Sequence, residues 1–155
     1  MDIIKTEKLT KNWKSQILTL WNNEYPEKLN FTSLATFETY LKNLTEPSHR
    51  LLVDADGNLK GWYFDFIREE EKWFAIIIDS TLHGKGYGTR LLTEAKEKEH
   101  ELNGWVIDRN EGKKRNGEVY KSPLAFYLKN GFERIPEIRL ELEVLSAVKI
   151  YWRQL

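Results

Sequence analysis

The stretch that decides the fold reads Ile76-Ile77-Ile78-Asp79-Ser80-Thr81-Leu82-His83-Gly84-Lys85-Gly86-Tyr87-Gly88-Thr89-Arg90-Leu91-Leu92. An apolar run typical of a buried strand enters a loop with three glycines, and the loop opens directly into a helix. Glycine adopts backbone conformations closed to other residues and lets a ligand approach the peptide N–H groups. The first N–H groups of the helix and the positive end of its dipole then face the loop. The segment therefore predicts a site for a phosphate or pyrophosphate.

The spacing of the glycines separates the known phosphate-binding motifs. A Walker A loop places Lys and then Ser or Thr after its last glycine, whereas Lys85 precedes Gly86 and Gly88. A dinucleotide-binding loop has the pattern Gly-x-Gly-x-x-Gly, and the glycines at 84, 86 and 88 are more compact. Both departures disfavour a P-loop-like nucleotide enzyme. On the loop alone, a turn that merely joins a strand to a helix is nearly as well supported as phosphate binding.

Periodicity before this stretch predicts two helices and then strands. Apolar residues at helical spacing indicate a first helix that ends near Pro26 and a second over residues 34–44. The second helix is capped by Thr32 or Ser33 and stops near Pro47. Strands follow at residues 50–53, 61–67 and 73–79, the last two joined by a charged hairpin tip at 68–72.

The C-terminal half predicts the rest of a mixed sheet. A helix over 89–102, ended by Asn103 and Gly104, precedes a short strand at 105–107, which implies a parallel βαβ unit with a right-handed crossover. A polar loop, a short helix and two strands follow, at residues 111–118, 122–129, 133–144 and 147–152. We expect one α/β domain over residues 1–155: helices first, then a mixed twisted sheet with a central parallel βαβ unit flanked by helices.

Composition narrows the classes of function. Lys and Arg number 24, as do Asp and Glu, so no net charge attracts nucleic acid or an anionic membrane. The chain has no cysteine, which excludes disulfides, thiolate zinc sites and a cysteine nucleophile. The three histidines lack metal-ligand spacing, so we expect no metal site. No signal peptide is recognisable at the N-terminus, and a cytoplasmic protein is the expectation.

Two segments together resemble the GNAT superfamily of acyl-CoA-dependent N-acyltransferases. The family motif Gln/Arg-x-x-Gly-x-Gly/Ala at a helix start is matched by His83-Gly84-Lys85-Gly86-Tyr87-Gly88. The family's later helix ends Tyr-x-x-x-Gly-Phe, matched by Tyr127-Leu128-Lys129-Asn130-Gly131-Phe132. Two positions depart from the pattern. His83 replaces the usual Gln or Arg, and Tyr120 stands where the family often has Asn, seven residues before the tyrosine.

The resemblance implies acetyl-CoA as the cofactor and a set of binding residues. The peptide groups of Ile76, Ile77 and Ile78 are expected to pair with its pantetheine arm, as an added strand would. The pyrophosphate is expected at the loop and helix start, formed by His83, Gly84, Lys85, Gly86, Tyr87, Gly88 and Thr89. Tyr127 is expected to protonate the departing thiolate. The implied reaction is direct attack of a small-molecule or peptide amine on the acetyl group.

The sequence does not identify the residues that bind or deprotonate the amine. Glu69, Glu70 and Glu71 are candidate bases, although an exposed hairpin tip explains them more simply, and Asp65 could face the acceptor cleft. Asp79 is expected to cap or turn the chain after its strand, and water could also take the proton of the amine. Lys113, Lys114 and Arg115 either touch a cofactor 3′-phosphate or form an exposed charged loop, and the loop is the simpler account. A module that binds acyl-CoA without turnover is the alternative function. The final strands leave a homodimer open, and the acceptor is not specified.

Overall fold

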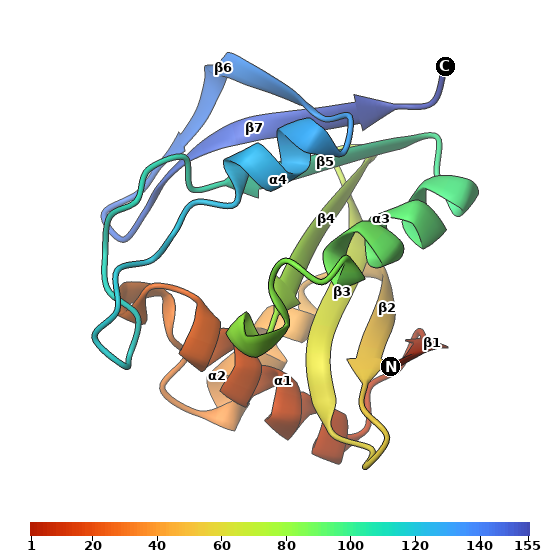
Figure 1. Cartoon of the computed structure of the whole chain (residues 1–155), viewed down its shortest axis with the longest axis vertical. Coiled ribbons are helices and arrows are strands. Elements are labelled where there is room, and N and C mark those ends of the chain that lie inside the picture. Colours follow the sequence, from red (N-terminus) through yellow and green to blue (C-terminus); the bar gives the residue numbers. More distant parts are fainter.

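The computed structural model describes residues 1–155 and forms one seven-stranded sheet (Figure 1). The strand order is β1-β2-β3-β4-β5-β7-β6, and only β4 and β5 run parallel to each other. The strands are β1 (Asp2–Thr6), β2 (Thr45–Val53), β3 (Leu59–Arg68), β4 (Glu71–Ile78), β5 (Glu101–Val106), β6 (Glu133–Glu141) and β7 (Ser146–Arg153). The mixed α/β architecture and its central parallel pair are as predicted.

Four helices accompany the sheet: α1 (Lys11–Glu24), α2 (Leu34–Lys42), α3 (Tyr87–Lys98) and α4 (Leu124–Lys129). Short 3-10 turns, η1 (Glu27–Leu29) and η2 (Ser80–Leu82), follow α1 and β4. Thr10 caps α1 by accepting the Trp13 N–H, and Ser33 caps α2 by accepting the Thr36 N–H. None of these helices combines the length and apolar character needed to span a membrane.

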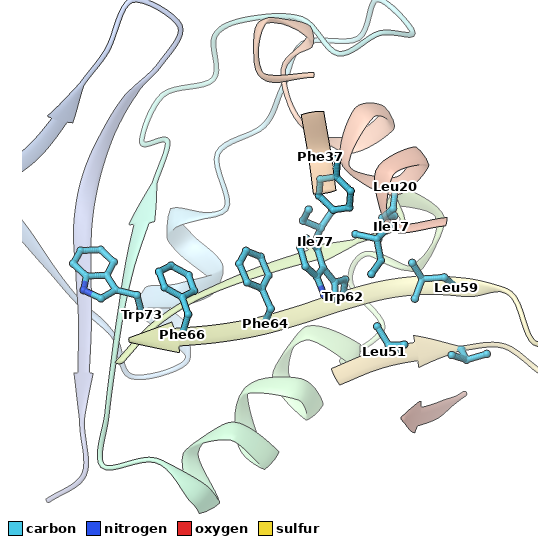
Figure 2. Close-up of a cluster of buried hydrophobic side chains, with 11 residues drawn as sticks. Ile17, Leu20, Phe37, Leu51, Leu59, Trp62, Phe64, Phe66, Trp73 and Ile77 are labelled. Atoms are coloured by element: carbon cyan, nitrogen blue, oxygen red, sulfur yellow. The ribbon is translucent and has the colours of Figure 1, made fainter. Parts of the chain in front are cut away.

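The helices cover the two faces of the sheet as separate layers. Along β4, Trp73 and Ile77 belong to the cluster that α1 and α2 cover, whereas Phe74 belongs to the cluster under α3 and α4. This alternation follows from the two-residue period of a strand. Figure 2 shows Trp62 and Phe64 on the α1/α2 side of β3, with α3 beyond the other side. The loop after β4 therefore leads from the middle of the sheet to the helix layer formed by α3 and α4.

Several predicted boundaries are wrong for local reasons. The second helix ends at Lys42, and Pro47 lies inside β2, at a register shift where Glu46 has a φ of 49°. A bulge accommodates proline, because the missing N–H interrupts no regular ladder there. The chain also begins with a strand rather than a helix, since Ile3 of β1 pairs with Leu52 at the edge of the sheet.

The prediction that Asn103 and Gly104 end a helix is also wrong. Helix α3 stops at Lys98, and both residues lie within β5. Gly104 is needed for packing rather than for a left-handed cap, because a Cβ there would lie 3.0 Å from the Phe74 ring. Glu94 and Lys98 are spaced for a pair along one face of α3, but Glu94 Oε1 instead lies 2.9 Å from Nη1 of Arg50 in β2. A tertiary contact has replaced the local one.

Candidate active site

The site is built where the two parallel strands separate. β4 and β5 share a single register pair, Trp73 with Asn103, and beyond it they diverge toward their carboxyl ends (Figure 1). A small cavity of about 50 Å³ lies between them. Its walls come from β4, β5 and β7, from the end of α1, and from α4 and the segment before it: Tyr25, Phe74, Ala75, Ile76, Gly104, Trp105, Val106, Ile107, Tyr120, Pro123, Tyr127 and Ile150.

The diverging edge of β4 leaves peptide groups without a strand partner. The Asp79 N–H donates to the Lys60 carbonyl at 2.9 Å, which makes these residues a hydrogen-bonded pair between β4 and β3. Pairing alternates along an antiparallel ladder, so Ile77 bonds to β3 and the peptide groups of Ile76 and Ile78 point away from it. Those two residues face the widening gap, and Ile77 does not.

The loop after β4 presents a run of unpaired donors. The peptide N–H groups of residues 84–89 donate to no backbone carbonyl, and the first helical bond is from Arg90 to the Gly86 carbonyl, at 3.0 Å. Gly84 and Gly86 have φ angles of 77° and 86°, which favour glycine, and a Cβ at either would meet nothing within 4 Å. An anion can therefore approach this backbone closely, at the start of a twelve-residue helix.

Gly88 has a different reason for being glycine. A Cβ at this position would lie 2.7 Å from the Phe126 ring. The side chain of Phe126 comes from α4, so the absence of a side chain at 88 lets α4 pack close to α3. Of the three glycines that carried the sequence motif, two shape the loop and one permits helix packing.

The imidazole of His83 is engaged by the strand that precedes the loop. Its Nε2 lies 2.8 Å from the Ile78 carbonyl oxygen, within hydrogen-bonding distance. The side chain thus ties the loop back to the end of β4. The imidazole occupies the Ile78 carbonyl, one of the outward-facing carbonyls of that edge. This contact gives His83 a positioning role in the loop, in place of the Gln or Arg of the family motif.

Helix α4 carries Tyr127 to the cavity. The ring is 6% exposed and packs edge-on against Phe74, Phe126 and Phe132, at centroid distances of 5.8, 5.1 and 5.6 Å. Gly131, with a φ of 86°, ends the helix so that the Phe132 N–H donates to the Tyr127 carbonyl at 3.1 Å.

The hydroxyl of Tyr127 has no partner within the chain; among the tyrosine hydroxyls, those of Tyr63 and Tyr151 donate to carboxylates. Burial raises the pKa of Tyr127 above its ordinary value of 10.0, and the neighbouring Tyr120 raises it further. The phenol is therefore protonated at neutral pH, with its hydroxyl available as a hydrogen-bond donor.

The carboxylates considered as bases lie elsewhere. Asp65 sits on the α3 side of β3, where it accepts a hydrogen bond from the Tyr63 hydroxyl at 2.8 Å and lies 3.6 Å from Lys72 Nζ. Glu69 and Glu70 form the two-residue hairpin turn, with φ angles of 50° and 66°. Asp79 caps η2 by accepting the Thr81 N–H. None of these side chains lines the cavity between β4 and β5.

On the α1 side of the cavity, the structure brings together residues that the sequence did not connect. Tyr25 and Tyr120 line the cavity with Tyr127, and their rings lie 6.4 Å apart. Glu24 pairs with Lys114, whose side chain is only 11% exposed, whereas Lys113 and Arg115 on either side of it are exposed, as predicted for this loop. The segments that meet here are far apart in the chain, and no local sequence pattern predicts that they meet.

Comparison with known proteins places this geometry in a family. The profile of the acetyltransferase (GNAT) domain matches residues 47–134. Curated protein sequences give no significant match. An aminoglycoside 6′-N-acetyltransferase complexed with coenzyme A is similar, at 15% identity and a TM-score of 0.72, over 99% of this chain and 97% of that one.

Two further solved structures are similar over nearly their whole length. Spermidine N-acetyltransferase from Vibrio cholerae, in complex with CoA and spermine, has 20% identity and a TM-score of 0.68, over 98% of this chain and 95% of that one. A putative phosphinothricin N-acetyltransferase has 16% identity and a TM-score of 0.70, with 98% of each chain covered. At such identities the likeness is one of fold. Together with the domain match, it shows that this single-domain α/β chain belongs to the GNAT acetyltransferase family.

Proposed function

We propose that the protein transfers an acetyl group from acetyl-CoA to a primary amine, without a covalent enzyme intermediate. The observation that carries the proposal is the run of unpaired N–H groups at residues 84–89, beside the diverging edge of β4. Peptide donors that converge at a helix start suit a diphosphate. An open strand edge suits an extended, amide-containing arm.

The residues at this edge fit the cofactor implied by the family. The Ile76 carbonyl and the Ile78 N–H would pair with the pantetheine arm, while Ile77 holds β4 to β3. The loop from Gly84 to Thr89 would hold the pyrophosphate through its N–H groups, with open space over Gly84 and Gly86. His83 would act by fixing the loop through its contact with the Ile78 carbonyl.

Acetyl-CoA supplies the acetyl group as a thioester. The amine nitrogen bonds to the acetyl carbon as the carbon–sulfur bond breaks; the nitrogen loses one proton and the sulfur gains one. The Ile76 N–H, which faces the gap, would polarise the acetyl carbonyl. The chain has no cysteine that could carry the acetyl group, which supports direct attack.

Tyr127 is the proposed donor to the departing sulfur. A thiol has a pKa of about 8.5, and burial raises the pKa of Tyr127 above 10.0, so a thiolate is the weaker base of the two. The phenol therefore stabilises the thiolate as a hydrogen-bond donor, and the proton that the sulfur finally gains is the one that the amine nitrogen loses. The free hydroxyl at the cavity wall supports this role.

The test combines binding and turnover. Acetyl-CoA is expected to raise the melting temperature, and ATP is expected not to. Release of free thiol from acetyl-CoA in the presence of an amine panel then measures transfer. A protein that binds acetyl-CoA but releases no thiol with any amine would be a non-catalytic acyl-CoA-binding module. Stabilisation by ATP and not by acetyl-CoA would contradict both the acetyltransferase and the acyl-CoA-binding module.

A further inference from the structure

Glu24, the last residue of α1, is a carboxylate that protein almost encloses. Its side chain is 11% exposed, and Oε2 accepts the Ser80 N–H at 3.0 Å. Oε1 lies 3.2 Å from Nζ of Lys114, whose side chain is equally buried. Removing one partner from an enclosed ion pair leaves an uncompensated charge, which is strongly unfavourable. The proposed acetyl transfer assigns no task to this pair.

Glu24 stands between an outer pocket and the inner cavity. The outer pocket, of about 390 Å³, has only polar walls, supplied by the end of α1, the turn after β4 and the loop around Lys114. The next residue, Tyr25, lines the inner cavity where β4 and β5 diverge. Burial raises the pKa of Tyr120, on the cavity wall, and the Glu24 carboxylate raises it further. Glu24 therefore adjoins the route from solvent to the thioester site.

Lys114 comes from a loop that closes over this route. Figure 1 shows the segment between β5 and α4 reaching down to the end of α1. The Glu27 N–H donates to the Lys113 carbonyl at 2.8 Å, and Pro26 bridges to Lys114. The inner cavity, at about 50 Å³, has room for a few waters and not for an amine beside a thioester. An acceptor that enters the site from this side passes the loop that carries Lys114.

We propose that Glu24 binds a second positive charge of the acceptor, and that Lys114 holds this position until the acceptor replaces it. The inference rests on the proposed acetyl transfer. An alkylammonium group has the charge and the N–H donors of Lys114 Nζ, so the exchange keeps the enclosed carboxylate compensated. The acceptor class is an aliphatic amine with a further cationic group, a diamine or polyamine.

The first test compares putrescine with butylamine, which differ in the second ammonium group. Thiol release should give putrescine the higher kcat/KM in the wild-type protein. Glu24→Gln should raise KM for putrescine about 10- to 100-fold, as expected for the loss of a charged hydrogen bond, and remove the preference. Thiol release with butylamine by the same variant measures any general loss of activity, and the calorimetric Kd for CoA tests whether the cofactor loop is intact. A preference that survives in Glu24→Gln would overturn the proposal.

The second test uses neighbouring lysines as a matched pair. Lys114→Gln removes the cation that competes for Glu24, so KM for putrescine should fall and putrescine should raise the melting temperature more than in the wild type. Lys113→Gln changes the net charge equally, but the Lys113 side chain is exposed, and no effect is expected. Equal effects of the two substitutions would reduce the result to net charge and contradict the exchange.

The two hypotheses fail differently. If the wild type turns over both amines without preference, acetyl transfer stands and the role of Glu24 is refuted. If no amine supports thiol release, the proposed function fails. Binding at Glu24 is still measured then, because putrescine should raise the melting temperature of the wild type and not of Glu24→Gln. Absence of that difference would refute the site as well.

Discussion

The two sides of the gap between β4 and β5 differ in the kind of chemical group that they present. On the α3 side, the proposed binding groups are peptide N–H donors of residues 84–89, which follow one another in the chain. On the α1 side, the groups are side chains, and Glu24 meets Lys114 across 90 positions of sequence. Backbone recognition needs glycines at fixed spacing, so it leaves a local motif. Side-chain recognition needs only that distant segments meet, and leaves none.

The largest effect is expected from Tyr127, where the two sides meet. Tyr127→Phe should lower kcat about 100-fold or more, the usual result of removing one donor from a developing charge. CoA affinity should hold, because the loop amides are untouched. The free energy of unfolding should also hold, since the hydroxyl has no partner within the chain.

Stopped assays of thiol release and calorimetry with CoA measure the two quantities for Tyr127→Phe. Tyr151→Phe is the control, because its hydroxyl lies 3.4 Å from Glu101 and does not line the cavity. A kcat for Tyr127→Phe equal to that of the wild type would remove the donor role.

The same contrast explains what the sequence predicted. Strand β4, the glycine loop, α3 and the Tyr127 helix were found because periodicity and glycine spacing are local. The strand that holds Gly104 was misread as a helix end, since its reason for being glycine is the Phe74 ring of a neighbouring strand. Glu24 and Lys114 were missed as a pair because each looks like an ordinary surface charge until the fold encloses both.

Acidification is expected to have a smaller effect, a loss of stability that comes from His49 on the α1/α2 side of the sheet. His49 is 3% exposed, and its Nδ1 accepts the Trp62 Nε1–H at 3.0 Å. Burial lowers the pKa of His49 from 6.5 to about 4. Between those values the unfolded chain binds a proton that the folded chain does not, so stability falls as pH falls. At pH 5 the loss relative to neutral pH is about 2 kcal/mol, at about 1.4 kcal/mol per unit.

Urea unfolding at pH 7 and pH 5 measures the loss. His49→Gln should remove this part of the pH dependence, because an amide does not titrate and its oxygen can accept the Trp62 N–H. The exposed His100 is the control, and His100→Gln should keep the wild-type difference. An unaltered difference between the two pH values in His49→Gln would show that the acid sensitivity arises elsewhere.

The smallest expected effect tests whether the α3 side recognises its ligand through the backbone. Gly57 and Gly86 have φ angles of 81° and 86°, and a Cβ at either meets nothing within 4 Å, but Gly57 lies in the turn between β2 and β3. Alanine should destabilise both variants alike, by about 1–2 kcal/mol of backbone strain. Only Gly86→Ala should also weaken CoA binding, by about ten-fold, because strain turns the loop N–H groups and the methyl stands where an anion must approach. If calorimetry gave both variants the wild-type Kd for CoA, the unpaired N–H groups would not be the anion site. Recognition through the backbone on the α3 side would then be refuted.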